Sequence, residues 1–69
     1  MSERVSGVVR WFNQVRGDGY IDGDDGREAR VQREAIEGGT FLAEGLRVTY
    51  VLVGDDDDDL HAEHIRIVE

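Results

Sequence analysis

Residues 7–13 read Gly-Val-Val-Arg-Trp-Phe-Asn, and residues 16–21 read Arg-Gly-Asp-Gly-Tyr-Ile. Val5, Gly7 and Val9 occupy alternate positions, which is the period of a half-buried strand. The run Arg10-Trp11-Phe12 then breaks this period, as a β-bulge does when it adds one residue to a strand. We therefore predict a first strand over residues 3–13, with a bulge between Gly7 and Trp11.

The second stretch predicts a short strand that begins near Gly17. Because strand side chains alternate between faces, Asp18 and Tyr20 would share one face while Gly19 and Ile21 share the other. Residues 22–26, Asp-Gly-Asp-Asp-Gly, then predict a turn, since Asp and Gly favour turns and positive φ angles.

Three more strands complete the expected set. They cover residues 27–32, with Ala29 and Val31 pointing inward, residues 47–53, and residues 60–68. Ala35 and Ile36 would close the core after the third strand, and Phe41 and Leu42 would anchor the loop over residues 37–45. Five short strands without proline or an amphipathic helix indicate an all-β chain that folds as a small antiparallel barrel.

The composition bounds the kinds of protein that this chain can be. Its 69 residues suffice for one domain of marginal stability. The absence of cysteine rules out disulfides and suits a reducing cytosol. No apolar run is long enough for a membrane helix or a signal peptide. We therefore expect a soluble, cytoplasmic protein that does not interact with membranes.

The charge balance is strongly acidic. Sixteen acidic residues against eight basic ones give a net charge of −8, which repels polyphosphates at long range. The basic residues are all arginines, and five of them fall between residues 10 and 33. The positive charge is therefore concentrated in the half of the chain that carries the two opening motifs.

The order and spacing of several short motifs resemble a bacterial cold-shock domain over nearly the whole chain. Besides the two opening stretches they are Glu34-Ala35-Ile36, Leu42-Ala43-Glu44-Gly45 and Ala62-Glu63-His64-Ile65. The resemblance implies a five-stranded OB-fold barrel that forms a single domain over residues 1–69. It also implies that single-stranded RNA or DNA stacks on aromatic rings of this barrel, in an RNA-chaperone or transcription-related role.

Five residues match nucleic-acid-binding positions of that family. Trp11 and Tyr20 keep rings on which bases can stack, and Arg10 and Arg16 keep the positive charge of the family's lysines. Phe12 is equally compatible with the core and with the surface. Trp11 also has an alternative role as a half-buried core residue, because a small barrel needs large side chains.

Four other positions carry no ring where the family has an aromatic or histidine side chain. They are Asp18, Arg30, Gln32 and Arg33. Each stacked base contributes about 1–3 kcal/mol to single-strand binding. The resemblance therefore implies binding that is weak and tolerant of sequence.

Two interpretations of these substitutions stay open. In the first, Asp18 and Arg30 form a cross-strand ion pair, and the face no longer binds nucleic acid. The chain would then be an acidic protein-interaction module that contacts a basic protein partner or mimics nucleic acid. In the second, Arg30 and Arg33 join Arg10 and Arg16 in a strip that binds phosphates and stacks on bases.

The remaining candidate sites point to no further chemistry. The chain has no cysteine and no Ser/His/Asp arrangement, and a barrel of this size offers no deep cleft. We therefore expect that the protein is not an enzyme and has no small-molecule substrate. His61 and His64 would project from opposite faces of a strand, so we expect no shared metal and no cofactor. The five aspartates at 55–59 would form a solvated loop.

Overall fold

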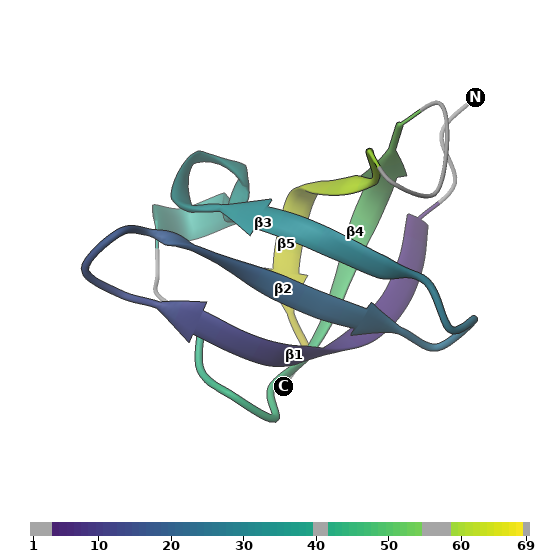
Figure 1. The fold of residues 1–69 in the computed structure, drawn as a ribbon, viewed down its shortest axis with the longest axis horizontal. Helices are drawn as coiled ribbons and strands as arrows, with labels where there is room; N and C mark the ends of the chain where they lie inside the picture. The colour runs from purple at the N-terminus through teal and green to yellow at the C-terminus, as the bar shows by residue number, and fades with distance from the viewer. Residues whose placement is uncertain (1–3, 40–41, 55–58, 69) are drawn as a thin grey trace.

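Five strands close into a barrel in the computed structural model, which describes residues 4–39, 42–54 and 59–68. They are β1 (Arg4–Asn13), β2 (Asp18–Gly23), β3 (Glu28–Gln32), β4 (Arg47–Val53) and β5 (His61–Ile67). β1, β2 and β3 lie side by side at the front, and β4 and β5 cross behind them (Figure 1). The predicted all-β, five-stranded OB-fold barrel is confirmed. Glu3, the first residue of the predicted first strand, and Phe41, a predicted anchor of the loop over residues 37–45, lie outside the described residues.

Alternation along the strands places the core between the front strands and the rear pair. Ala29 and Val31, which were predicted to point inward, are at most 1% exposed, and Ile21 of β2 is 0% exposed. Ile36 and Leu42 close the core from the segment between β3 and β4, as predicted. The other buried hydrophobic residues are Val9, Val48, Tyr50, Leu60, Ala62 and Ile65. Burying such side chains is the main favourable term for a chain of this size.

β1 bulges where the sequence predicts it, between Val9 and Trp11. The extra residue turns both Arg10 and Trp11 outward. On β2, Gly19 faces Phe12, and a Cβ atom at Gly19 would lie against the Trp11 carbonyl oxygen and 2.8 Å from Phe12 Cα. Glycine at this position therefore allows β1 and β2 to approach closely beneath the exposed aromatic residues.

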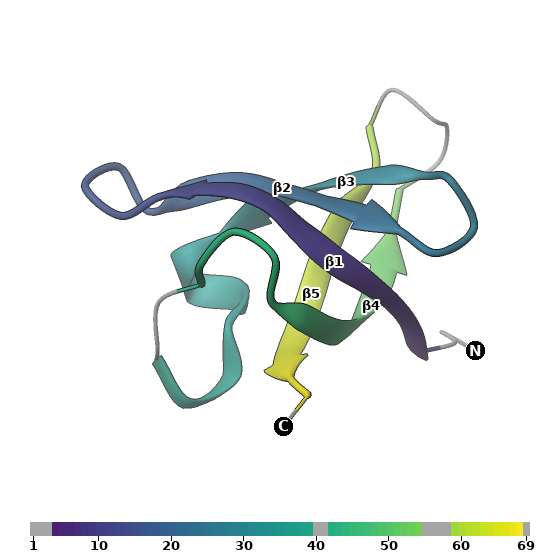
Figure 2. The same cartoon turned by 90° about the horizontal axis from the view of Figure 1, so that it is seen from below.

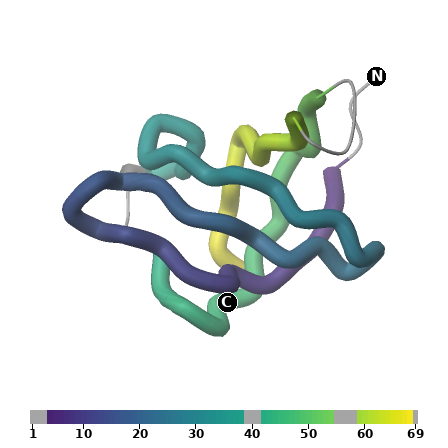
Figure 3. The backbone as a smooth tube through the Cα atoms, in the orientation of Figure 1, coloured from purple at the N-terminus to yellow at the C-terminus, as the bar shows by residue number. Residues whose placement is uncertain are grey.

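The turn between β1 and β2 is organised by Asn13. Its side-chain Oδ1 accepts hydrogen bonds from the backbone N–H groups of Val15 and Arg16, both at 3.0 Å, and its carbonyl oxygen accepts one from Gly17 at 2.7 Å. This turn and the β2–β3 turn lie at opposite ends of the front strands (Figure 3). The arrangement leaves the middle of these strands as an uninterrupted outer surface.

The barrel closes between β3 and β5, which pair in parallel through Arg30 and His61, whereas the other neighbouring strands pair antiparallel. After β3 the chain forms the short 3₁₀ turns η1 (Arg33–Ala35) and η2 (Glu37–Gly39). Viewed from below, these turns lie beside β5 under the front strands (Figure 2). Among the described residues no helix has the length and apolar character needed to cross a membrane.

The expectation that His61 and His64 project from opposite faces of β5 is wrong. The β4–β5 register shifts between Thr49 and Val51, and His64 adopts a left-handed φ of 51°. This bulge adds one residue to β5, so both imidazoles are exposed, with Ala62 buried between them. Within the described part of the chain no cluster of three or more potential metal ligands is present.

Candidate nucleic-acid interface

The outward surface of β1, β2 and β3, called the front face below, carries a row of planar side chains. Trp11 lies opposite Tyr20, and Tyr20 lies opposite Arg30. The two aromatic ring centroids are 5.4 Å apart with the planes inclined by 56°. Trp11 is 39% exposed and Arg30 is exposed. This row offers an indole, a phenol and a guanidinium to a ligand.

Arg10, on the β1 bulge, is held by carboxylates of the neighbouring strands. Its Nη1 donates a short hydrogen bond to Glu28 of β3 and lies 3.9 Å from an oxygen of Asp22 on β2. The three side chains are about half-exposed, so water screens these ion pairs and each contributes about 1 kcal/mol or less. A phosphate can therefore compete for Arg10, but it must displace carboxylates to do so.

The predicted ion pair between Asp18 and Arg30 is wrong. Asp18 lies opposite Gln32 rather than Arg30, because the β2–β3 register puts Tyr20 in that place. The Asp18 carboxylate instead accepts a hydrogen bond at 3.1 Å from Arg16, two residues before it. Arg30 forms no ion pair with any described residue. The first interpretation therefore loses the ion pair on which it was built, while the interaction module that it describes stays a prediction.

Asp18 has one oxygen that the Arg16 contact does not satisfy. Its Oδ1 is buried and has no hydrogen-bond partner within the described residues. An unpaired buried acceptor costs about 1–3 kcal/mol because it has lost water without gaining a donor. The Asp18 carboxylate is therefore an energetically costly replacement for an aromatic ring at this position.

Arg33 follows β3 in η1 and lies against the β1–β2 turn. Its Nη2 donates to the Gln14 carbonyl oxygen at 3.1 Å, and its guanidinium covers Gly17, whose φ is 79°. Arg16, Asp18, Gln32 and Arg33 also line a groove of about 350 Å³ at this end of the front face. The structure therefore brings Arg16, Gln32 and Arg33 together beside the row, next to the β1–β2 turn.

Phe12 occupies an intermediate position. It is partly buried and packs against the core cluster, on the opposite side of β1 from the exposed Trp11. Its role in ligand binding stays a prediction, and the structure packs it against the core rather than on the exposed side of β1.

Two functional contributions were missed in the sequence. Alternation along the third strand already indicates that Glu28 faces outward. Its contact with Arg10 could not be predicted, because the contact joins β1 and β3, which are not adjacent in the sequence. Asn13 was noted only as the end of a motif, although an asparagine followed by a turn is a known signal for side-chain capping of backbone N–H groups. Both residues control how the arginines of the front face are presented.

Comparison with known proteins gives a consistent result. No family model matches the chain. The major cold shock protein CspA of Pseudomonas aeruginosa is 36% identical over 70 residues, which cover 99% of this chain and 100% of that protein. Cold shock protein CspA of Rhizobium meliloti is 45% identical over 53 residues, 72% of this chain and 77% of the relative. Cold shock protein CapB of Pseudomonas fragi is 31% identical over 70 residues, again 99% of this chain and 100% of the relative. With relatives this similar over its full length, and with the barrel described above, the chain belongs to the cold shock protein family.

Proposed function

We propose that this protein binds single-stranded RNA or DNA on its front face, weakly and with little sequence preference. The observation that supports this most directly is the pair formed by the exposed Trp11 and the partly exposed Tyr20 beside Arg30, on the barrel of a cold-shock family member. Bases stack on such rings whatever their identity, because every base has a π-face. The protein would act by binding rather than by catalysis, in an RNA-chaperone or transcription-related role in the cytoplasm.

Each candidate residue has a distinct part in this proposal. Trp11 and Tyr20 stack on bases, and Arg30 stacks on a neighbouring base or binds a phosphate. Arg10, Arg16 and Arg33 bind phosphates, since a guanidinium offers paired N–H donors to phosphate oxygens. The remaining two residues are Gln32, which hydrogen-bonds to a base edge, and Phe12, which supports Trp11 from below.

The proposed binding is weak because several residues replace aromatic rings. Asp18, Arg30, Gln32 and Arg33 offer fewer stacking surfaces than rings would, and each lost stack costs about 1–3 kcal/mol. Arg10 and Arg16 must also exchange carboxylate partners for phosphates. A net charge of −8 adds long-range repulsion that grows as salt is removed.

The test is a fluorescence titration of Trp11, the chain's one tryptophan, with a single-stranded oligonucleotide at low and moderate salt. We expect saturable quenching that weakens with salt, and a lower affinity for the Tyr20→Ala variant because one ring is lost. The duplex of the same sequence is the matched control and should bind less well, since its bases cannot reach the rings. Unchanged Trp11 emission at high micromolar oligonucleotide would contradict the proposal.

A second candidate function is favoured by the carboxylates that hold Arg10 and Arg16. If these ion pairs persist, the front face is nearly neutral within an acidic protein, and a basic protein partner becomes the better ligand. The same titration with an arginine-rich peptide separates the two functions. Binding of the peptide without binding of the oligonucleotide would identify an acidic protein-interaction module.

A further inference from the structure

The row that contains Trp11, Tyr20 and Arg30 continues beyond β3. Arg30 is opposite His61 at the parallel bridge that closes the barrel. Residues directly opposite each other on paired strands project from the same face, so the imidazole follows the guanidinium in the row. The His61 side chain is 44% exposed. An indole, a phenol, a guanidinium and an imidazole thus stand in one line across four strands.

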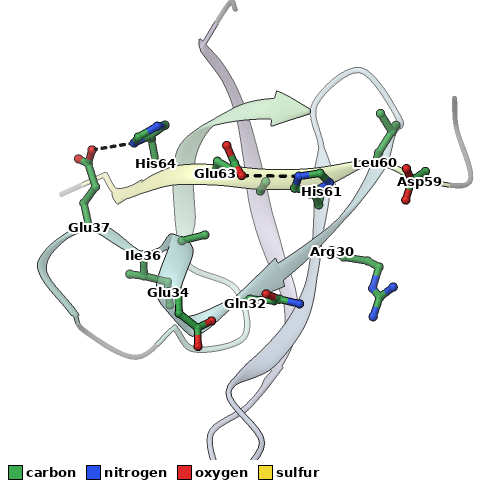
Figure 4. A pocket seen from close by; sticks show the side chains of 12 residues that line it. Arg30, Gln32, Glu34, Ile36, Glu37, Asp59, Leu60, His61, Glu63 and His64 are labelled. Carbon is green, nitrogen blue, oxygen red and sulfur yellow. Dashed lines mark ion pairs between the residues drawn. The ribbon is translucent and has the colours of Figure 1, made fainter. Parts of the chain in front are cut away.

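The end of this row borders a second groove, which is larger than the one lined by Arg16 and Arg33. A cavity of about 550 Å³ lies between β3 with η1 on one side and β5 on the other, because β3 and β5 separate beyond the single bridge. Arg30 and Gln32 lie along one wall, and His61 and Glu63 lie along the other (Figure 4). A strand that crosses the front face at the Trp11 row therefore meets an open path at His61.

We propose that His61 is an additional binding residue of this interface, at which the nucleic-acid strand passes from the front face into the groove between β3 and β5. The proposal rests on the single-strand binding proposed above. A neutral imidazole offers a planar surface to a base, and a protonated one also attracts a phosphate. A protonated imidazole carries a positive charge, so binding at this position becomes stronger as the pH falls.

The charges around His61 determine the direction of this effect. Glu63 on β5 has an oxygen 3.6 Å from His61 Nε2, and Asp59 and Glu34 line the same groove. On the neighbouring strands, Arg30 of β3 carries a positive charge and Val53 of β4 none. With a neutral imidazole the nearby carboxylates repel a phosphate. Protonation of His61 neutralises Glu63 locally and removes part of that repulsion.

The experiment measures affinity by Trp11 fluorescence at pH 6 and pH 8, over the same salt series at each pH, with an oligothymidylate that lacks terminal phosphates. We expect binding several-fold tighter at pH 6. The plot of log affinity against log salt should also steepen by about 0.7, as for one more phosphate contact on a single strand. The His61→Gln variant should lose both effects. The His64→Gln variant is the matched control, because the chain has two histidines, and it should keep both effects.

A second variant separates stacking from charge. His61→Phe keeps a planar ring without a titratable group, so it should bind at pH 8 at least as well as the natural protein and show no difference between pH 6 and 8. Affinity that does not change with pH in the natural protein, or a pH effect removed by His64→Gln instead, would overturn the role of His61 and leave the proposed function standing. An absence of binding at both pH values would overturn the function and this inference together.

Discussion

Arg10 shows how a neighbouring carboxylate can limit how strongly the front face binds a phosphate. Its guanidinium is within reach of a phosphate on the exposed side of β1 but is engaged by Glu28 and lies close to Asp22. Any phosphate must therefore compete with charges that the protein already supplies. The neighbouring pair of Arg16 and Asp18 presents the same competition on the other side of Trp11.

Removing the Glu28 charge should strengthen nucleic-acid binding. In Glu28→Gln the guanidinium of Arg10 is released, so we expect several-fold tighter oligonucleotide binding at low salt and a smaller gain at high salt, where charge interactions are screened. The melting temperature should change little, because an exposed ion pair contributes about 1 kcal/mol or less. Trp11 fluorescence titrations over a salt series measure the effect.

The matched control for this variant is Asp24→Asn. It removes the same charge and breaks an exposed ion pair of 3.0 Å with Arg47, outside the proposed binding residues. Equal gains from Glu28→Gln and Asp24→Asn would show that overall charge, and not the release of Arg10, controls affinity.

Restoring a ring at position 18 should improve both stability and binding. Asp18→Phe removes a buried oxygen that has no partner within the described residues and adds a stacking surface on the strand of Tyr20. We expect a higher melting temperature and an affinity increase of about fivefold or more, since one stacked base contributes about 1–3 kcal/mol. The comparison is with Asp18→Asn, which also releases Arg16 but adds no ring. If the two variants bind equally well, no base lies at position 18.

At the scale of elements, a network of ion pairs and hydrogen bonds attaches the segment after β3 to β5. Glu37 of η2 accepts a short hydrogen bond from Arg66 and lies 3.6 Å from His64. On the other side of β5, Arg4 of β1 donates to the His64 carbonyl oxygen at 2.6 Å and to Thr49 Oγ1 at 3.0 Å. These contacts hold one end of the groove between η1 and β5 in place.

This attachment should depend on pH through Glu37. The hydrogen bond from Arg66 lowers the pKa of Glu37 below its ordinary value of 4.5, and the nearby positive charges of Arg66, Arg4 and His64 act in the same direction. A carboxyl whose pKa is lower in the folded state stabilises the fold above the unfolded value, and this stabilisation is lost as the pH falls through the folded value. Glu37→Gln should therefore melt below the natural protein at pH 7, and the difference should disappear as the pH falls below 4.5.

Thermal unfolding followed by circular dichroism at pH 7 and at pH 3 measures this difference. Glu34→Gln is the control, because Glu34 is exposed in η1 and forms no ion pair with a described residue. Its melting temperature should stay close to that of the natural protein at pH 7. A loss for Glu37→Gln that is equally large at pH 3 would exclude the charge of Glu37 as its cause.

At the scale of the whole molecule, the net charge of −8 opposes both folding and ligand binding. Screening repulsion among the acidic residues should stabilise the fold, so the melting temperature should rise as salt shortens the Debye length from about 30 Å at 0.01 M to about 3 Å at 1 M. Salt should at the same time weaken oligonucleotide binding, because phosphate contacts are screened. Stability and affinity are thus expected to respond to salt in opposite directions.

The variant with asparagine at positions 55–59 tests the source of the salt effect. Replacing five aspartates changes the net charge from −8 to −3. We expect a higher melting temperature at low salt and a flatter salt dependence than in the natural protein. A melting temperature that does not respond to salt in either protein would show that charge repulsion does not limit stability.

Local sequence patterns were enough to predict the five strands and part of the core. Alternation at Ala29 and Val31 identified the buried face of the third strand, because the side-chain period of a strand is a local property. The break in this period at Arg10-Trp11-Phe12 located the bulge that exposes Trp11. The resemblance to the cold-shock domain supplied the candidate binding residues, most of which lie on β1, β2 and β3, whereas Phe12 packs against the core and Arg33 lies in η1.

Contacts between strands that are distant in the sequence determine which charges neutralise one another and where the front face ends. The pairing of Arg10 with Glu28, the place of Asp18 opposite Gln32, and the bridge between Arg30 and His61 all depend on register between strands. Register is set by how the whole barrel closes, because a shift of one residue on any strand changes every partner at once. For the same reason the bulge in β5, which exposes both histidines, could not be predicted from spacing alone.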